Sequence, residues 1–256
     1  MNKLSNLKII EITERIYKIS LFSSEQYKKS REEIYKLCYE MRSYATKSEE
    51  SLSKIIDLHR ELVKVQNARA ASIENKIMGL LVDMCILIDI DNLDNLGNDL
   101  EEIRILEEKY EGNERLNLRL NSMLMNYAKE IINSEVTAKE AKAKRYQNRI
   151  AQALQLLSEL NYCYEIKGIK EIFKSKMQDE NKKIQYFALS GLENYYGTEN
   201  AEELTEKEEK LLEKIIKKTN DRSIVFTCCQ ILINDGVFDE SDAMSRMDNW
   251  KDKNRR

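Results

Sequence analysis

Proline is absent from this 256-residue chain, and glycine occurs only seven times. Average usage is about 5% for proline and about 7% for glycine. Tight connections between β-strands depend on these turn-forming residues, so a chain that has so few of them is not typical of a β-rich protein. Helix interiors, by contrast, tolerate neither residue well. The two shortages together predict an all-α protein.

Residues that build metal sites and catalytic sites are also scarce. The chain has one histidine, His59, and its five cysteines form no Cys-x-x-Cys pair. His59 lies on an apolar stripe without the His-Glu-x-x-His pattern of zinc enzymes, which favours a packed imidazole. Adjacent Cys228 and Cys229 point about 100° apart on a helix, which suits core packing better than chelation. We therefore expect a non-enzyme with no catalytic residue, no cofactor and no metal.

The charges are nearly balanced, with 42 basic and 45 acidic residues and a formal net charge of −3. A dedicated nucleic-acid-binding domain is usually strongly basic. The longest apolar stretch, residues 77–90, contains Asp83 and Asp89 and is shorter than the roughly 20 residues that span a bilayer. The cysteines lie among apolar residues, as in reduced proteins. We expect no membrane association and a cytoplasmic location.

Apolar residues at helical spacing predict a helix over residues 4–21, a second from the cap Ser23-Ser24-Glu25 to about residue 44, and a third from Ser48. The stripe of this third helix begins at Leu52. The helix either ends near Asn67 or continues to Ile90. In the second case it is longer than 40 residues and belongs to a solenoid or a coiled-coil arm. Both interpretations stay open.

An acidic stretch marks a change in composition. Residues 89–115 contain ten acidic and three basic residues, and Gly97 and Gly112 interrupt them. Asp89, Asp91 and Asp94 do not match the ligand positions of an EF-hand loop, so a solvated acidic segment is expected. The stretch is either a domain boundary or a helical hairpin with an acidic outer face. We place the boundary between an N-terminal helical region, 1–112, and a second region, 113–256.

Two segments of the second region are near-copies of one another, residues 179–192 and 220–232. Their apolar positions match at an offset of 40 residues: Ile184 with Ile224, Tyr186 with Phe226, Ala188 with Cys228, Leu189 with Cys229, and Leu192 with Leu232. Each segment follows an amphipathic stretch and a polar break. Thr205 and Glu208 predict a capping box before one of these stretches, and Asp235-Gly236 predicts a helix end.

The pattern resembles the HEAT-like, armadillo-type helical repeats, whose period is about 40–47 residues. The proline common in such repeats is missing here. The resemblance covers residues 145–250 and implies a right-handed α-solenoid of antiparallel helix pairs. First helices are expected over 165–178 and 205–219, and second helices over 181–196 and 222–234. The N-terminal part is expected to be a helical bundle or further helix pairs.

An α-solenoid presents an extended surface, so the leading hypothesis is a non-enzymatic scaffold or adaptor that binds a protein partner as a complex subunit. The acidic stretches 89–114 and 199–213 and the basic segment 137–149 would orient that partner. Aromatic residues are enriched at the energetic centres of interfaces. The aromatic anchors predicted on this basis are Tyr186, Tyr195, Tyr196 and Trp250.

The alternative hypothesis is a nucleic-acid-associated subunit of a larger nucleoprotein assembly. Segment 137–149 carries five basic residues against one glutamate, and such a face can contact phosphates. The basic residues are Lys139, Lys142, Lys144, Arg145 and Arg149. The exposed side of a long helix explains the same pattern and is the favoured interpretation. A third hypothesis is a structural subunit, either a helical bundle or a coiled coil, built by the N-terminal half.

Overall fold

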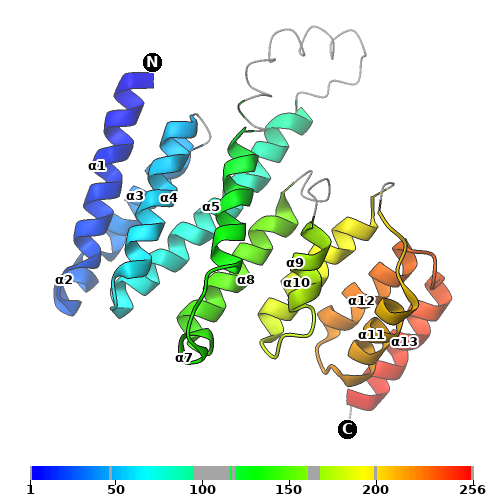
Figure 1. The fold of residues 1–256 in the computed structure, drawn as a ribbon. Helices are drawn as coiled ribbons and strands as arrows, with labels where there is room; N and C mark the ends of the chain where they lie inside the picture. Colours follow the sequence, from blue (N-terminus) through cyan, green and yellow to red (C-terminus); the bar gives the residue numbers. More distant parts are fainter. Residues whose placement is uncertain are drawn as a thin grey trace, which may run out of the picture. The chain divides into compact units, whose positions relative to one another are not determined.

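The computed structural model describes the backbone of residues 2–45, 48–94, 116, 119–160, 168–198 and 201–254 (Figure 1). Every regular element in these ranges is a helix, which confirms the all-α prediction. The chain divides into two compact units, Met1–Leu160 and Asn161–Arg256.

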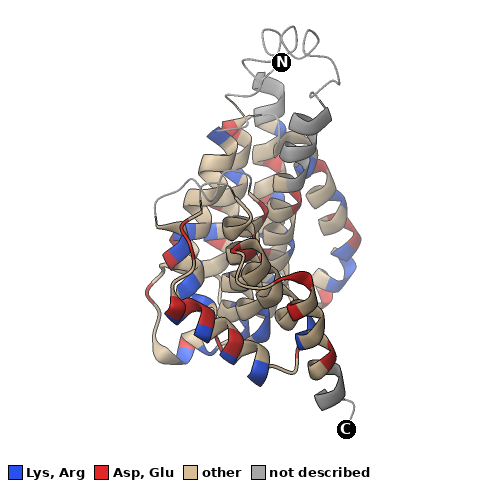
Figure 2. Cartoon of the chain, turned by 90° about the vertical axis from the view of Figure 1, so that its right-hand side faces the viewer, with Lys and Arg blue, Asp and Glu red and all other residues tan. Residues whose placement is uncertain are grey.

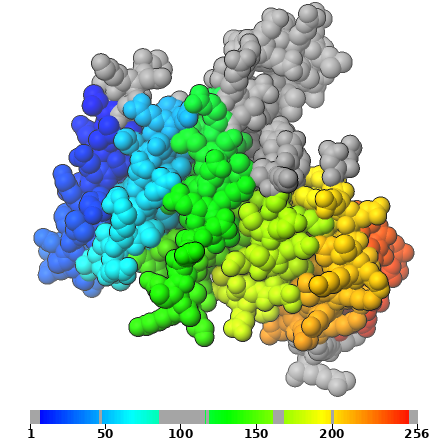
Figure 3. Space-filling model, viewed as in Figure 1, coloured from blue at the N-terminus to red at the C-terminus, as the bar shows by residue number. Residues whose placement is uncertain are grey.

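The first unit is a layered set of helices. α1 packs against α3 and α4, α4 packs against α5, and α5 packs against α8. Figure 3 shows the surfaces of these segments next to one another in the order of the chain. The helices are α1 (Asn2–Ser20), α2 (Ser24–Lys29), α3 (Arg31–Ala45), α4 (Glu49–Lys64), α5 (Ala68–Asp94), an unlabelled helix over residues 119–132, α7 (Ala138–Ala141) and α8 (Lys144–Glu159).

Polar caps fix where the helices of the first unit begin. The Ser23 side chain forms a capping box with Gln26 at the start of α2, and Ser48 caps α4. Asn67 Oδ1 accepts a hydrogen bond from the Ala70 amide at 2.8 Å, while its Nδ2 donates to the Ser20 carbonyl. The helical segment therefore ends before α5, so the predicted break near Asn67 is confirmed. The single helix longer than 40 residues is wrong.

The second unit contains α9 (Ile169–Lys176), α10 (Lys182–Tyr196), α11 (Glu206–Lys218), α12 (Arg222–Asn234) and α13 (Glu240–Asn254). The helices predicted over 165–178, 181–196, 205–219 and 222–234 correspond to the first four of these. α10 packs against α9 and α12, and α12 also packs against α11 and α13.

The 40-residue offset extends to the hydrogen bonds that begin α10 and α12. Asn181 Oδ1 accepts from the amides of residues 183 and 184 at 3.0 and 3.4 Å. Asp221 Oδ1 accepts from the amides of residues 223 and 224 at 2.9 and 3.4 Å. Four of the five matched apolar pairs are buried in the core of the unit, and the pair Tyr186 and Phe226 is not. The buried pairs are Ile184 and Ile224, Ala188 and Cys228, Leu189 and Cys229, and Leu192 and Leu232.

Two glycines of the second unit have specific structural roles. A Cβ atom on Gly191 of α10 would lie 2.2 Å from the ring of Phe173, which is fully buried on α9. Gly236 has φ +75°, and the Val237 amide donates to the Leu232 carbonyl at 2.9 Å. This is a Schellman motif, so the predicted helix end at Asp235-Gly236 is confirmed.

The division between the compact units falls at Leu160, whereas the composition placed a boundary at residue 112. α8 belongs to the first unit because it packs along α5. The segment 95–115 lies outside the described residues, as do the side chains of 86–94, and so do most of the acidic positions predicted there.

Candidate functional site

A buried carboxylate organises the polar interior of the first unit. The side chain of Glu74, on α5, is 2% exposed and accepts from two arginines of α8. Arg145 Nε lies 2.7 Å from Oε2, and Arg149 Nε lies 2.6 Å from Oε1. Arg145 also donates to the carbonyls of Leu62 and Val65 at the end of α4. One carboxylate thereby ties α8 to α5, and Arg145 caps α4.

The only histidine of the chain lies next to this cluster. His59 is fully buried, and its Nδ1 shares a hydrogen bond with the hydroxyl of Tyr127. Its Nε2 is buried without a hydrogen-bond partner among the described residues. Burial, reinforced by the positive charges of Arg149, Arg145 and Arg60, lowers the pKa of His59 to about 3. The imidazole is neutral at physiological pH, and the prediction of a packed histidine is confirmed.

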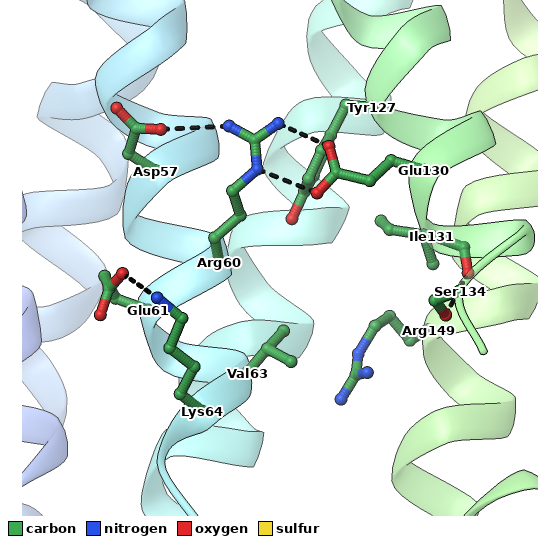
Figure 4. Close-up of a pocket in the computed structure, with 10 residues that line it drawn as sticks. All are labelled: Asp57, Arg60, Glu61, Val63, Lys64, Tyr127, Glu130, Ile131, Ser134 and Arg149. Atoms are coloured by element: carbon green, nitrogen blue, oxygen red, sulfur yellow. Dashed lines mark hydrogen bonds and ion pairs between the residues drawn. The ribbon is translucent and has the colours of Figure 1, made fainter. Parts of the chain in front are cut away.

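A cavity of about 370 Å³ opens beside this cluster, between α4, the helix 119–132 and the start of α8 (Figure 4). Arg60 lines one end of the cavity. The Arg60 guanidinium pairs with both oxygens of Glu130, at 3.0 and 2.6 Å, and with Asp57 at 3.1 Å. Figure 4 shows Arg149 extending from α8 toward α4 on the other side of the cavity.

The described residues contain no group of three or more His, Cys, Asp or Glu side chains placed to hold a metal ion. Burial raises the pKa of Cys38 and that of Cys229 to about 11. Burial raises the pKa of Cys228 as well. These thiols are therefore protonated at neutral pH, and a protonated thiol is a weak nucleophile.

The structure places the four predicted aromatic anchors in different surroundings. Tyr186 is half-exposed on α10 and meets Phe187 edge-on. Tyr195 and Tyr196 contact one another and flank the Lys170 ammonium, and Tyr196 is buried. Trp250 Nε1 donates to the Thr219 carbonyl at 3.1 Å, which holds α13 against the end of α11. Tyr186 has the surroundings that best suit an external contact.

Sequence reasoning did not select Phe226 as an anchor. Its side chain, on α12, is 51% exposed, although positions 225, 228 and 229 around it are buried. It occupies the place that Tyr186 has on α10, so the 40-residue match was the signal that pointed to it.

The five basic residues predicted as a nucleic-acid face do not act together. Arg145 and Arg149 turn inward and bind Glu74, with side chains 21% and 14% exposed. Lys139, Lys142 and Lys144 lie at the surface. In the second unit, acidic residues occupy the first turn of α11 and basic residues its last. Figure 2 shows Lys and Arg residues (blue) interspersed with Asp and Glu residues (red) along the helices.

Comparisons with models of protein families, with curated proteins and with solved structures find no match to this chain. Within the described ranges, no helix is both long enough and apolar enough to cross a bilayer.

Proposed function

We propose that this protein is a non-enzymatic scaffold or adaptor, a HEAT-like α-solenoid that binds a protein partner along α10 and α12. One observation carries the proposal. Tyr186 and Phe226 occupy equivalent positions at the 40-residue offset, and Phe226 is exposed and Tyr186 partly exposed, while the other matched apolar positions are buried. Two aromatic side chains that reach solvent thus recur at equivalent positions of two helices that pack against one another.

About half of the Phe226 side chain is in contact with solvent, and a docking partner could bury it. Taking a fully exposed phenylalanine to full burial contributes about 1.5–3 kcal/mol, so a partner would gain roughly half of that at Phe226. Aromatic residues dominate the energetic centres of protein interfaces. The glutamate-rich segment 199–213, which includes the exposed Glu206, would steer a basic partner toward this surface.

The experiment is affinity capture of the full chain from its native host, with and without nuclease, followed by mass spectrometry. The proposal expects a stoichiometric protein partner that survives nuclease. The variants Phe226→Ala and Tyr186→Ala should each reduce its recovery, whereas Tyr39→Ala should not. Tyr39 is a suitable control because it is 77% exposed on α3 of the first unit. Equal recovery with all three variants would contradict the proposed surface.

The nucleic-acid alternative depends on Lys139, Lys142 and Lys144, since Arg145 and Arg149 are engaged by Glu74. Such binding would weaken steeply between about 50 and 200 mM salt, because counterions are released from the phosphates. A captured complex that collapses with nuclease, and that the triple Lys→Gln variant fails to form, would favour this alternative over the scaffold.

A further inference from the structure

One end of the cavity beside α4 has a local excess of positive charge, because Arg149 there belongs to the Glu74 cluster. Arg145, Arg149 and Glu74 carry two positive charges and one negative charge in contact with one another. The side chains of Glu74 and Arg149 are 2% and 14% exposed. Charges in so little water interact strongly with any ion that reaches them.

The two arginines differ in how many donors they have left. Arg145 uses Nε, Nη1 and Nη2 on Glu74, Val65 and Leu62. Within the described residues, Arg149 makes its hydrogen bond through Nε alone. A guanidinium has five N–H donors in a planar fork, so the Nη1 and Nη2 end of Arg149 keeps four. Arg149 also lines the cavity.

The acidic residues that line the cavity form ion pairs with Arg60 and Lys64 and not with Arg149. Glu130 and Asp57 bind Arg60. Glu61 binds Lys64 at 2.5 Å. Arg60 with its two carboxylates carries a net negative charge, so this end of the cavity repels a second anion. The wall between the two ends includes apolar surface from Val63, Ile131 and the ring of Tyr127.

We propose that this cavity binds a small organic monocarboxylate. The carboxylate accepts two parallel hydrogen bonds from the Nη1 and Nη2 groups of Arg149, and a short apolar body lies against Val63 and Ile131. The planar fork of arginine matches a carboxylate in this way. A volume of about 370 Å³ suits a small ligand, since pockets for drug-sized molecules range from about 300 to 1,000 Å³. The assignment is independent of the proposed partner surface on the second unit.

The test is a titration of the full chain with sodium pentanoate, monitored through the arginine Nε–H signals in ¹H–¹⁵N NMR spectra. Glutarate and inorganic phosphate serve as comparison anions. We expect saturable binding of pentanoate with a Kd on the order of 1–10 mM. Glutarate and phosphate should bind at least about fivefold more weakly, because one brings a second charge to the acidic end and the other lacks an apolar body.

Two variants and a control locate the site. Arg149→Lys keeps the charge but loses the fork and should weaken pentanoate binding at least about fivefold. Val63→Trp fills the cavity while leaving Glu74 and its two arginines in the sequence, and should abolish binding, so it carries the test even where the arginine variant fails to fold. Arg119→Lys alters an arginine that is 69% exposed and paired with Glu49, and should bind as the wild type does. Absence of saturable binding to the wild type, or equal binding by Val63→Trp, would overturn the assignment.

Discussion

Single residues decide how closely the helices of the second unit approach. Gly191→Ala would place a methyl group 2.2 Å from the buried Phe173 ring. Overpacking of this kind costs about 1–3 kcal/mol, against about 1 kcal/mol gained from the helix propensity of alanine. We therefore expect a net loss of stability, measured as a lower urea midpoint.

A second glycine provides the matched control. Gly79 on α5 has no atom within 4 Å of the place that a Cβ would occupy. Gly79→Ala should raise the urea midpoint slightly, because only the helix propensity changes, by about 1 kcal/mol. Equal effects of the two substitutions, in sign and size, would contradict the close α9–α10 contact.

The buried histidine makes the stability of the first unit depend on pH. The pKa of His59 is about 3 in the folded protein, below its ordinary value of 6.5. The unfolded chain therefore binds a proton that the folded chain does not between these values, and stability falls as the pH drops below about 6.5. From pH 7 to pH 5 the expected loss is about 2 kcal/mol.

The measurement is the free energy of urea unfolding at pH 7 and at pH 5, monitored by circular dichroism. His59→Gln is the comparison, because glutamine keeps a hydrogen-bonding group next to Tyr127 and does not titrate. Since the chain has one histidine, this variant should lose most of the pH dependence in that window. An unchanged pH profile in His59→Gln would show that the imidazole is not its source.

At the scale of elements, the N-caps of α10 and α12 are equivalent, so we expect each cap to contribute a similar amount to the free energy of unfolding. Asp221→Ala and Asn181→Ala each remove a side chain that accepts from two backbone amides. Each should cost about 1 kcal/mol, within the range of about 0.5–2 for such caps. Asp221→Asn should be nearly neutral because the amide oxygen still caps the helix. Fluorescence of Trp250, which is bonded to Thr219 near this cap, reports the unfolding of the second unit.

The boundaries of α10 and α12 could be predicted because a capping residue and an apolar stripe coincide within a few positions. The break between α4 and α5 stayed open. The apolar stripe continues across the break between the two helices. The hydrogen bonds that stabilise this break involve residues distant in sequence, because Asn67 donates to the Ser20 carbonyl and Arg145 donates to the carbonyls of Leu62 and Val65. Local periodicity contains no signal for such contacts.

The candidate cavity was beyond sequence reasoning for the same reason. Glu74 and Arg149 are 75 residues apart, and Arg60 and Glu130 are 70 apart. Segment 137–149 reads as uniformly basic, yet its two arginines turn inward while its lysines stay at the surface. Whether a basic side chain of this segment turns inward depends on a buried acidic partner, Glu74, which lies on another helix. The position of Phe226 was predictable in principle, because the repeat aligns it with Tyr186.

At the scale of the whole molecule, the two proposed sites lie in different compact units. The first unit contains the charged cavity next to a buried polar cluster, and the second contains Tyr186 and Phe226 on helices that pack against one another. Because the proposed partner surface lies in the second unit, changes in the first should leave partner binding intact.

The most direct test is the affinity of the captured partner for the purified chain and for the double variant Tyr186→Ala/Phe226→Ala, measured by calorimetry. We predict at least about a tenfold loss of affinity, which is 1.4 kcal/mol or more, for the double variant, and unchanged affinity for Tyr39→Ala. Circular dichroism should show that the double variant keeps its helices. Wild-type affinity in a folded double variant would contradict the assignment of the partner surface to α10 and α12.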